Sequence, residues 1–182
     1  MIFRPALTLL CSAALLGACV SQSTYNQQVQ KTSTYQKLDE QLKAELAGNQ
    51  AQIEQLQNLV KLTLANGILF AEGGWQLNEA GKALLTKIAP ALKDLTDQRI
   101  VVKGFTDNVP IGPALRERFP SNVELSTARA DAVADFLKAQ GVPGNLITTS
   151  GLGQAHPVAN NNTAEGRAKN RRVEIDVVEA PA

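Results

Sequence analysis

An acidic and a basic side chain stand at positions that the end of a strand and the start of a helix would bring together. Asp107 follows the apolar run 100–102, which is typical of a buried strand. Arg129 lies in a segment of helical periodicity, where four positions share one face: Asn122, Leu125, Ser126 and Arg129. A carboxylate binds an ammonium group, and a guanidinium binds a carboxylate as a fork. The pair therefore predicts a cleft for a zwitterion.

The same two residues could instead form a structural ion pair that joins the strand to the helix. An ion pair on the surface contributes little to stability, so a location in a cleft would favour the ligand.

Catalytic and metal-binding chemistry find little support in the sequence. Ser126 has no evident general base beside it, so it is not predicted to be a nucleophile. His156 is the single histidine, and the two cysteines, Cys11 and Cys19, lie near the N-terminus. A metal site needs several such donors together. We therefore expect a binding protein without enzymatic activity, metal ion or cofactor.

The composition is that of one modest globular domain with extensions. The chain has 182 residues, of which 44% are hydrophobic. Lys and Arg number 18 against 17 Asp and Glu, and aromatic residues make up only 4%. Nucleic-acid binding calls for a basic excess or stacking aromatics. Nucleic acid is therefore not expected as a partner.

Residues 1–18 predict a lipoprotein signal peptide. Arg4 precedes an apolar run shorter than the roughly 20 residues of a membrane-spanning helix. The run ends in Leu-Gly-Ala followed by Cys19, which resembles the lipobox in which the cysteine after the cleavage site is lipidated. The residues after Cys19 are Val and Ser rather than an inner-membrane retention signal, so we expect an outer-membrane anchor with the domain facing the periplasm. The alternatives are a secretory signal with an incidental cysteine and an uncleaved anchor.

Two segments are expected to link the anchor to the domain. Residues 19–34 are rich in Ser, Thr and Gln and predict a flexible tether. Residues 35–62 are Gln-rich and predict a helix with seven-residue repeats: Leu42, Asn49 and Leu56, and Leu46, Ile53 and Val60. This helix is either a short coiled coil that oligomerises the protein or a single solvated spacer. Tether and helix together would span about 60 Å if helical.

Residues 63–180 predict one α+β domain. Strands are expected near 61–64, 99–104, 146–150 and 171–178. Helices are expected over 78–95 and 122–140, the second starting at a capping box of Ser121 and Glu124. The order is βαβαββ, which predicts a mixed sheet with the helices packed on one face.

Short motifs within residues 66–178 agree in order and spacing with one known family. They are Phe70 with Leu77 and Gly81; Gly104 to Asp107; Asn122, Leu125, Ser126 and Arg129; Gly151 and Gly153 with Pro157; and Asn161 to Thr163, Arg167 and Asn170 to Glu174. As a set they resemble the OmpA-like peptidoglycan-binding domain, the family that includes Pal and the periplasmic part of MotB.

The resemblance implies a ligand and roles for individual residues. In this family the residues matching Asp107 and Arg129 hold the free end of meso-diaminopimelate in the peptidoglycan stem peptide. Thr106, Asn122, Leu125 and Phe70 match positions that line the cleft. Supporting roles are implied for three more residues: Arg167, Arg171 and Asn161. Two departures are Phe105, where the family usually has His, and a longer segment at 108–121 that looks like the MotB branch.

Three functions can be compared on these grounds. We expect an outer-membrane lipoprotein that binds peptidoglycan and tethers the membrane to the cell wall. A stator-like membrane component is the alternative, and it would need an uncleaved spanning helix. A cell-wall hydrolase would need a metal set or a nucleophile with its base. Trp75, the only tryptophan, is interpreted as a core residue more readily than as a wall for stacking sugars.

Overall fold

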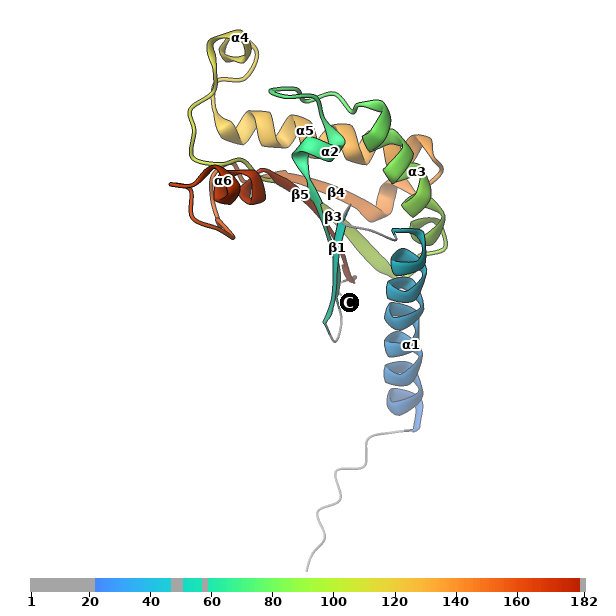
Figure 1. The fold of residues 1–182 in the computed structure, drawn as a ribbon. Coiled ribbons are helices and arrows are strands. Elements are labelled where there is room, and N and C mark those ends of the chain that lie inside the picture. Colours follow the sequence, from blue (N-terminus) through green and yellow to red (C-terminus); the bar gives the residue numbers. More distant parts are fainter. Residues whose placement is uncertain (1–21, 47–50, 57–58, 181–182) are drawn as a thin grey trace, which may run out of the picture.

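The computed structural model describes residues 22–46, 51–56 and 59–180. The predicted signal peptide and Cys19 lie outside these ranges. The described helices are α1 (Gln22–Glu45), α2 (Asn66–Leu69), α3 (Glu79–Lys93), α4 (Pro113–Arg116), α5 (Asn122–Ala139) and α6 (Ala164–Asn170). The strands are β1 (Ala51–Leu56), β2 (Leu59–Ala65), β3 (Gln98–Gly104), β4 (Ile147–Gly151) and β5 (Arg172–Glu179). Figure 1 shows their arrangement.

The five strands form one mixed sheet in the order β1-β2-β5-β3-β4. Strands β3 and β4 are parallel, and every other neighbouring pair is antiparallel. The sequence β2, α3, β3, α5, β4, β5 confirms the predicted βαβαββ order and the α+β class. The last strand enters the middle of the sheet, between β2 and β3, so β4 and β5 are not neighbours.

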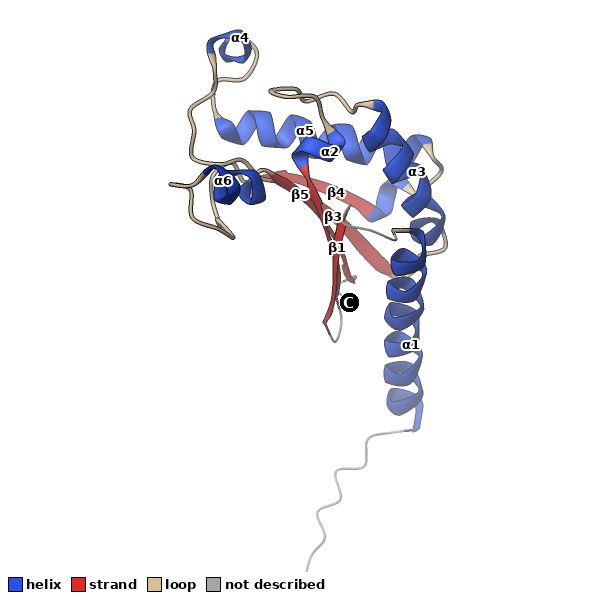
Figure 2. Cartoon of the chain, viewed as in Figure 1, coloured by secondary structure: helices blue, strands red, loops and turns tan. Residues whose placement is uncertain are grey.

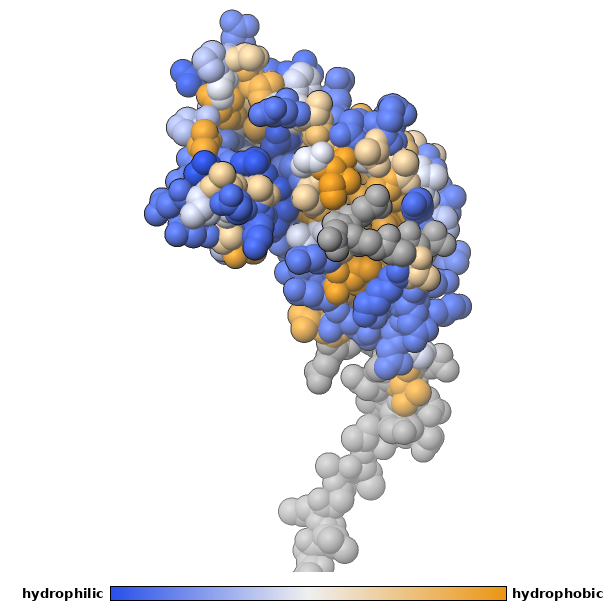
Figure 3. Space-filling model, viewed as in Figure 1, coloured by the Kyte–Doolittle hydropathy of each residue, from blue (hydrophilic) through white to orange (hydrophobic). Residues whose placement is uncertain are grey.

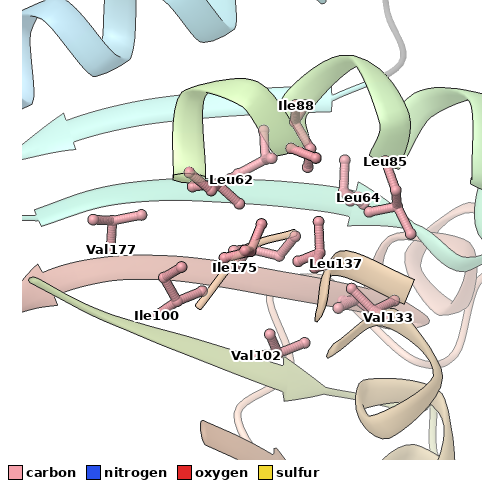
Figure 4. Packing of buried hydrophobic residues seen from close by; sticks show 14 of the residues in the cluster. Leu62, Leu64, Leu85, Ile88, Ile100, Val102, Val133, Leu137, Ile175 and Val177 are labelled. Atoms are coloured by element: carbon pink, nitrogen blue, oxygen red, sulfur yellow. The ribbon is translucent and has the colours of Figure 1, made fainter. Parts of the chain in front are cut away.

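Helices α3 and α5 cover one face of the sheet (Figure 2), and the core lies between the two layers. Alternate residues of the three inner strands point into this layer, where they meet apolar side chains of the two helices (Figure 4): Leu62, Leu64, Ile100, Val102, Ile175 and Val177 from the strands, and Leu85, Ile88, Val133 and Leu137 from the helices. This alternation is what a sheet with one covered face requires.

The carboxyl ends of β3 and β4 press directly against the first half of α5. A Cβ atom at Gly104 would collide with the carbonyl oxygen of Ser126, and one at Gly151 would collide with Thr127. Only glycine allows this approach of strand and helix. Ser126 is fully buried, and its hydroxyl accepts a hydrogen bond from the backbone N–H of Gly153 at 2.9 Å. The start of α5 is therefore fixed over the carboxyl ends of β3 and β4, where Asp107 follows β3.

The segment before the domain differs from the prediction. Helix α1 begins at Gln22, so much of the expected flexible tether is helical. Its second half packs beside α3 and the β1–β2 hairpin (Figure 1). Four side chains make this contact, and all are buried: Tyr35, Leu38, Leu42 and Leu46. Burial of this stripe stabilises the helix against the domain rather than against a second chain.

The predicted helix over 35–62 is wrong at residues 51–56 and 59–62. Residues 51–56 and 59–65 form the antiparallel strands β1 and β2, with Ile53 opposite Leu62. The seven-residue repeats therefore do not describe a coiled coil, since Leu42 and Leu46 face the chain's own domain and Ile53 and Val60 lie in the sheet. In the strand, Ala51 and Ile53 pack against the main core, whereas a solvated spacer helix would leave them in water.

Candidate functional site

A cleft of about 680 Å³ opens above the carboxyl end of β3. Its walls come from α2 and the loop after it, the loop after β3, the first turns of α5, and α6. All six residues predicted to bind the ligand line it: Phe70, Thr106, Asp107, Asn122, Leu125 and Arg129. The fold thus brings together residues from three separate stretches of the chain.

Asp107 is held in place from two sides. Its Oδ2 accepts a hydrogen bond from the guanidinium of Arg171 at 2.6 Å, which is also an ion pair. Its Oδ1 accepts the backbone N–H of Val109 at 3.0 Å. The residue is only 7% exposed. Because each carboxylate oxygen can accept more than one donor, Asp107 retains capacity for an ammonium group.

Arg129 is buried in the opposite wall and is only 5% exposed. Its Nε donates to the carbonyl oxygen of Gly74 at 2.9 Å, and its guanidinium carbon lies 5.5 Å from the ring centre of Phe70. Burial, and then the positive charge of Arg171, lower the pKa of Arg129 to about 10, while Asp107 acts in the opposite direction. Arg129 is therefore still a cation at neutral pH, but one that has lost much of its hydration.

Among the described residues, Asp107 and Arg129 form no ion pair with each other. The cleft therefore does not contain the alternative arrangement, a structural salt bridge that joins Asp107 to Arg129. Arg129 has no carboxylate partner there, and a buried guanidinium without one is unfavourable. A ligand carboxylate would supply the missing partner.

The charges around the cleft favour a ligand that carries carboxylate groups. Three guanidinium groups line it, those of Arg129, Arg167 and Arg171, against the two carboxylates of Asp107 and Glu72. In a recess of low dielectric this imbalance attracts anions. The separate position of Asp107 still provides one place for a cation.

The remaining predicted cleft residues have structural as well as surface roles. Thr106 donates its hydroxyl to the carbonyl oxygen of Asp107 at 2.8 Å. Asn122 donates from Nδ2 to the carbonyl oxygen of Val109 at 3.0 Å, which connects α5 to the loop after β3. Leu125 is buried beside Ile111 and gives the cleft an apolar floor.

The residues expected to support the site do so in different ways. Arg167 donates to the carbonyl oxygen of Asn161 at 2.9 Å, and the Asn161 side chain accepts from Asn170 at 2.7 Å. Both contacts fix the loop before α6. Arg171, for which the resemblance implied a supporting role, places its guanidinium in the cleft on Asp107.

Asn66 is a cleft residue that the sequence did not single out. It is 5% exposed, its Nδ2 lies 3.4 Å from the carbonyl oxygen of Phe105, and its Oδ1 has no hydrogen-bond partner within the described chain. The short helix α2, which starts here, places Asn66 between the backbone of Phe105 and that of Arg171.

Phe105 lies outside the cleft. Its ring is buried on the other face of the sheet, where the guanidinium carbon of Arg172 lies 3.6 Å from the ring centre. This is the distance of a close cation–π contact. The replacement of the usual His by Phe therefore changes the support of β5 and not the lining of the cleft.

The segment 108–121 builds a small second core beside the cleft. Ile111, Phe119 and Leu125 form its buried part, and Trp75 packs edge-on against Phe119 at 5.2 Å. Arg118 lies 4.6 Å from the centre of the Trp75 ring. Hydrophobic side chains reach the surface around α4 in this region (Figure 3). Trp75 is thus a packing residue, and it holds the loop that offers the Gly74 carbonyl to Arg129.

Residues 69–171, more than half of the chain, match the OmpA family. The protein belongs to the OmpA family. A MotB-like protein from Desulfovibrio vulgaris has the same fold, with a TM-score of 0.76 and 26% identity over 86% of this chain and 98% of that one.

Two relatives of this OmpA-family protein have names that bear on function. Peptidoglycan-binding protein ArfA of Mycobacterium tuberculosis is 42% identical over 122 residues, which are 67% of this chain and 35% of ArfA. Probable lipoprotein YiaD of Escherichia coli is 38% identical over 134 residues, which are 74% of this chain and 58% of YiaD. The chain thus spans about a third of ArfA and more than half of YiaD.

None of the helices within the described ranges combines the length and the apolar character needed to span a bilayer.

Proposed function

We propose that this OmpA-family protein binds peptidoglycan non-covalently through the free end of meso-diaminopimelate. The observation that carries the proposal is the buried guanidinium of Arg129, which has no carboxylate partner among the described residues and lies across the cleft from the carboxylate of Asp107. The side-chain end of diaminopimelate has one ammonium and one carboxylate on the same carbon. The ammonium binds Asp107 and the carboxylate binds Arg129, so both charges of the ligand are neutralised.

The protein acts as a tether between the outer membrane and the cell wall, with no catalytic step. The predicted lipid on Cys19 anchors one end, and the cleft holds the other. Because the second half of α1 packs on the domain, only the first half of this helix is left to extend toward the membrane. About 13 helical residues reach roughly 20 Å, which is shorter than the span expected from the sequence. Two attachments on one chain localise it strongly even if the cleft binds weakly.

Sedimentation with purified diaminopimelate-type sacculi tests this function. Full-length protein in detergent is compared with Asp107→Ala and Arg129→Ala, and with the controls Asp94→Ala and Arg99→Ala outside the cleft. Wild type and controls are expected in the pellet, and the two cleft variants in the supernatant while still folded. If wild type does not sediment, or if all five proteins do, the cleft is not the peptidoglycan site.

A stator-like role is the second candidate, supported by the likeness to the MotB-like structure. It requires a spanning helix before α1 in place of a cleaved signal. Metabolic labelling with a radioactive fatty acid separates the two functions. Label on wild type and none on Cys19→Ser supports the lipoprotein, whereas an unlabelled, uncleaved chain supports the stator-like component.

A further inference from the structure

A second groove, the side groove, adjoins the cleft on the other side of Asn122. It has a volume of about 700 Å³ and lies between the segment 108–121 and the loop after β4. Its lining is mainly apolar and small: Pro110, Ile111, Pro120, Val123, Leu152 and Ala155. Arg116 of α4 supplies its only charge among the described residues.

The two hollows share one narrow ridge. Pro110, Ile111 and Asn122 line both of them. Within this ridge, Asn122 donates a hydrogen bond to the carbonyl oxygen of Val109 at 3.0 Å. Val109 and Val123 are each 49% exposed, one beside each hollow. An exposed valine therefore stands on each side of the ridge.

A ligand clamped in the cleft by its side-chain end must lead its main chain out over the rim. In a diaminopimelate-type stem peptide, the residue attached to the diaminopimelate carbonyl is D-alanine. Its methyl group suits a small apolar recess, and its terminal carboxylate suits a guanidinium. Arg116 donates from one nitrogen to the carbonyl oxygen of Ile111 at 3.1 Å, its only hydrogen bond within the described chain. The rest of its fork remains available for an anion.

We propose that the side groove binds the D-alanine that follows diaminopimelate, with its methyl group against Val123 and Leu152 and its terminal carboxylate on Arg116. The inference rests on the proposed function of the cleft. It makes the protein selective for stem peptides that retain this alanine over those that end at diaminopimelate. It also gives the segment 108–121 a role in recognition, because that segment contributes Arg116 and most of one wall.

Calorimetric titration with two synthetic peptides tests the side groove. One is the tripeptide L-Ala-γ-D-Glu-meso-diaminopimelate, and the other carries one additional D-alanine. The full-length protein in detergent is expected to bind the longer peptide about tenfold more tightly, as one charge-assisted contact and one buried methyl group would give.

Two variants change residues that line the side groove but do not line the cleft. Arg116→Gln removes the cation, and Val123→Glu places a negative charge where the carboxylate would lie. Both should bind the tripeptide as wild type does and lose the tenfold gain for the longer peptide. The matched controls Glu117→Gln and Val158→Glu change similar exposed positions outside the side groove and should keep the gain.

The outcomes separate this inference from the proposed function. Equal binding of the two peptides by wild type would contradict D-alanine binding in the side groove, while diaminopimelate binding in the cleft would still hold. Equal weakening of both peptides in the two variants would show an effect on the cleft or the fold, and would also overturn it. If wild type binds neither peptide, the cleft itself is not a diaminopimelate site, and the inference falls with it.

Discussion

Asp107 and Arg129 face one cleft, yet each is held by a different part of the chain. Asp107 pairs with Arg171 at 2.6 Å, and Arg129 bonds the carbonyl oxygen of Gly74 at 2.9 Å. Both side chains are more than nine-tenths buried. Since neither neutralises the other at contact distance, the cleft presents a fixed anion and a fixed cation before any ligand arrives. Such preorganised charges bind a zwitterion without first breaking a salt bridge between Asp107 and Arg129.

Replacing Arg129 with Met should abolish binding without destabilising the fold. Arg129 is buried without a carboxylate partner among the described residues, so its burial is unfavourable to the folded state. Met fills a similar volume without that penalty. We expect the free energy of unfolding to stay unchanged or to rise by about 1 kcal/mol. Denaturant unfolding and sacculus sedimentation measure the two effects, and a loss of 2 kcal/mol or more, about the size of a lost structural pair, would contradict this account.

The lowered pKa of Arg129 predicts a pH dependence of stability. The pKa of about 10 in the folded protein lies well below the ordinary value of an arginine side chain. Between these values the unfolded chain keeps a proton that the folded protein has lost, so this residue makes the free energy of unfolding rise with pH. Below about pH 10 the penalty of burying the cation is fully present. The difference in unfolding free energy between wild type and Arg129→Met should therefore shift toward wild type at about pH 11, and a constant difference would contradict the pKa.

The strand that ends at Asp107, the helix that bears Arg129 and the cleft between them could be predicted, because each follows from a local sequence pattern. The apolar run before Asp107 marks a buried strand, and the spacing of Asn122, Leu125 and Arg129 marks one helix face. Glycines at the strand ends allow the two to meet. The pairing of Asp107 with Arg171 could not be predicted in this way. The two residues lie 64 positions apart, and they meet only because β5 enters the sheet beside β3.

The strand β1 could not be predicted from the sequence for a related reason. Leu42 and Leu46 form an apolar stripe, and a stripe has the same spacing whether it packs on another helix or on the chain's own sheet. The residues that follow are rich in Gln, and polar residues of this kind do not favour a strand. Pairing of β1 with β2 overrides that local preference.

Removal of a buried side chain from α1 should destabilise the whole domain. Leu42 is 1% exposed and belongs to the main core. Leu42→Ala is expected to lower the free energy of unfolding by about 2–4 kcal/mol. Gln41→Ala, at an exposed neighbour on the same helix, is the control and should change it little. If both variants unfold like wild type, α1 is a solvated spacer, and a fragment starting after it would suffice for function.

Restoring the usual His at position 105 should leave peptidoglycan binding unchanged. The Phe105 ring faces Arg172 on the far side of the sheet, away from the cleft. Phe105→His weakens a cation–π contact, and we expect a loss of about 1 kcal/mol in unfolding free energy. Sedimentation with sacculi should match wild type. A gain or loss of binding comparable to that of Asp107→Ala would place residue 105 in ligand recognition.

Arg171 should stabilise the folded protein through Asp107. Removing one partner of a largely buried ion pair leaves the other charge uncompensated. The Asp107 side chain is 9% exposed and that of Arg171 is 43% exposed. Because water screens the half-exposed Arg171, the free energy lost on its removal is smaller than for a fully buried pair. We expect Arg171→Met to lower the free energy of unfolding by about 1–2 kcal/mol. Addition of Asp107→Asn to the same chain should recover part of that loss, because the stranded charge is then gone. A double-mutant cycle by denaturant unfolding measures the coupling. A coupling near zero would mean that Arg171 serves the ligand alone.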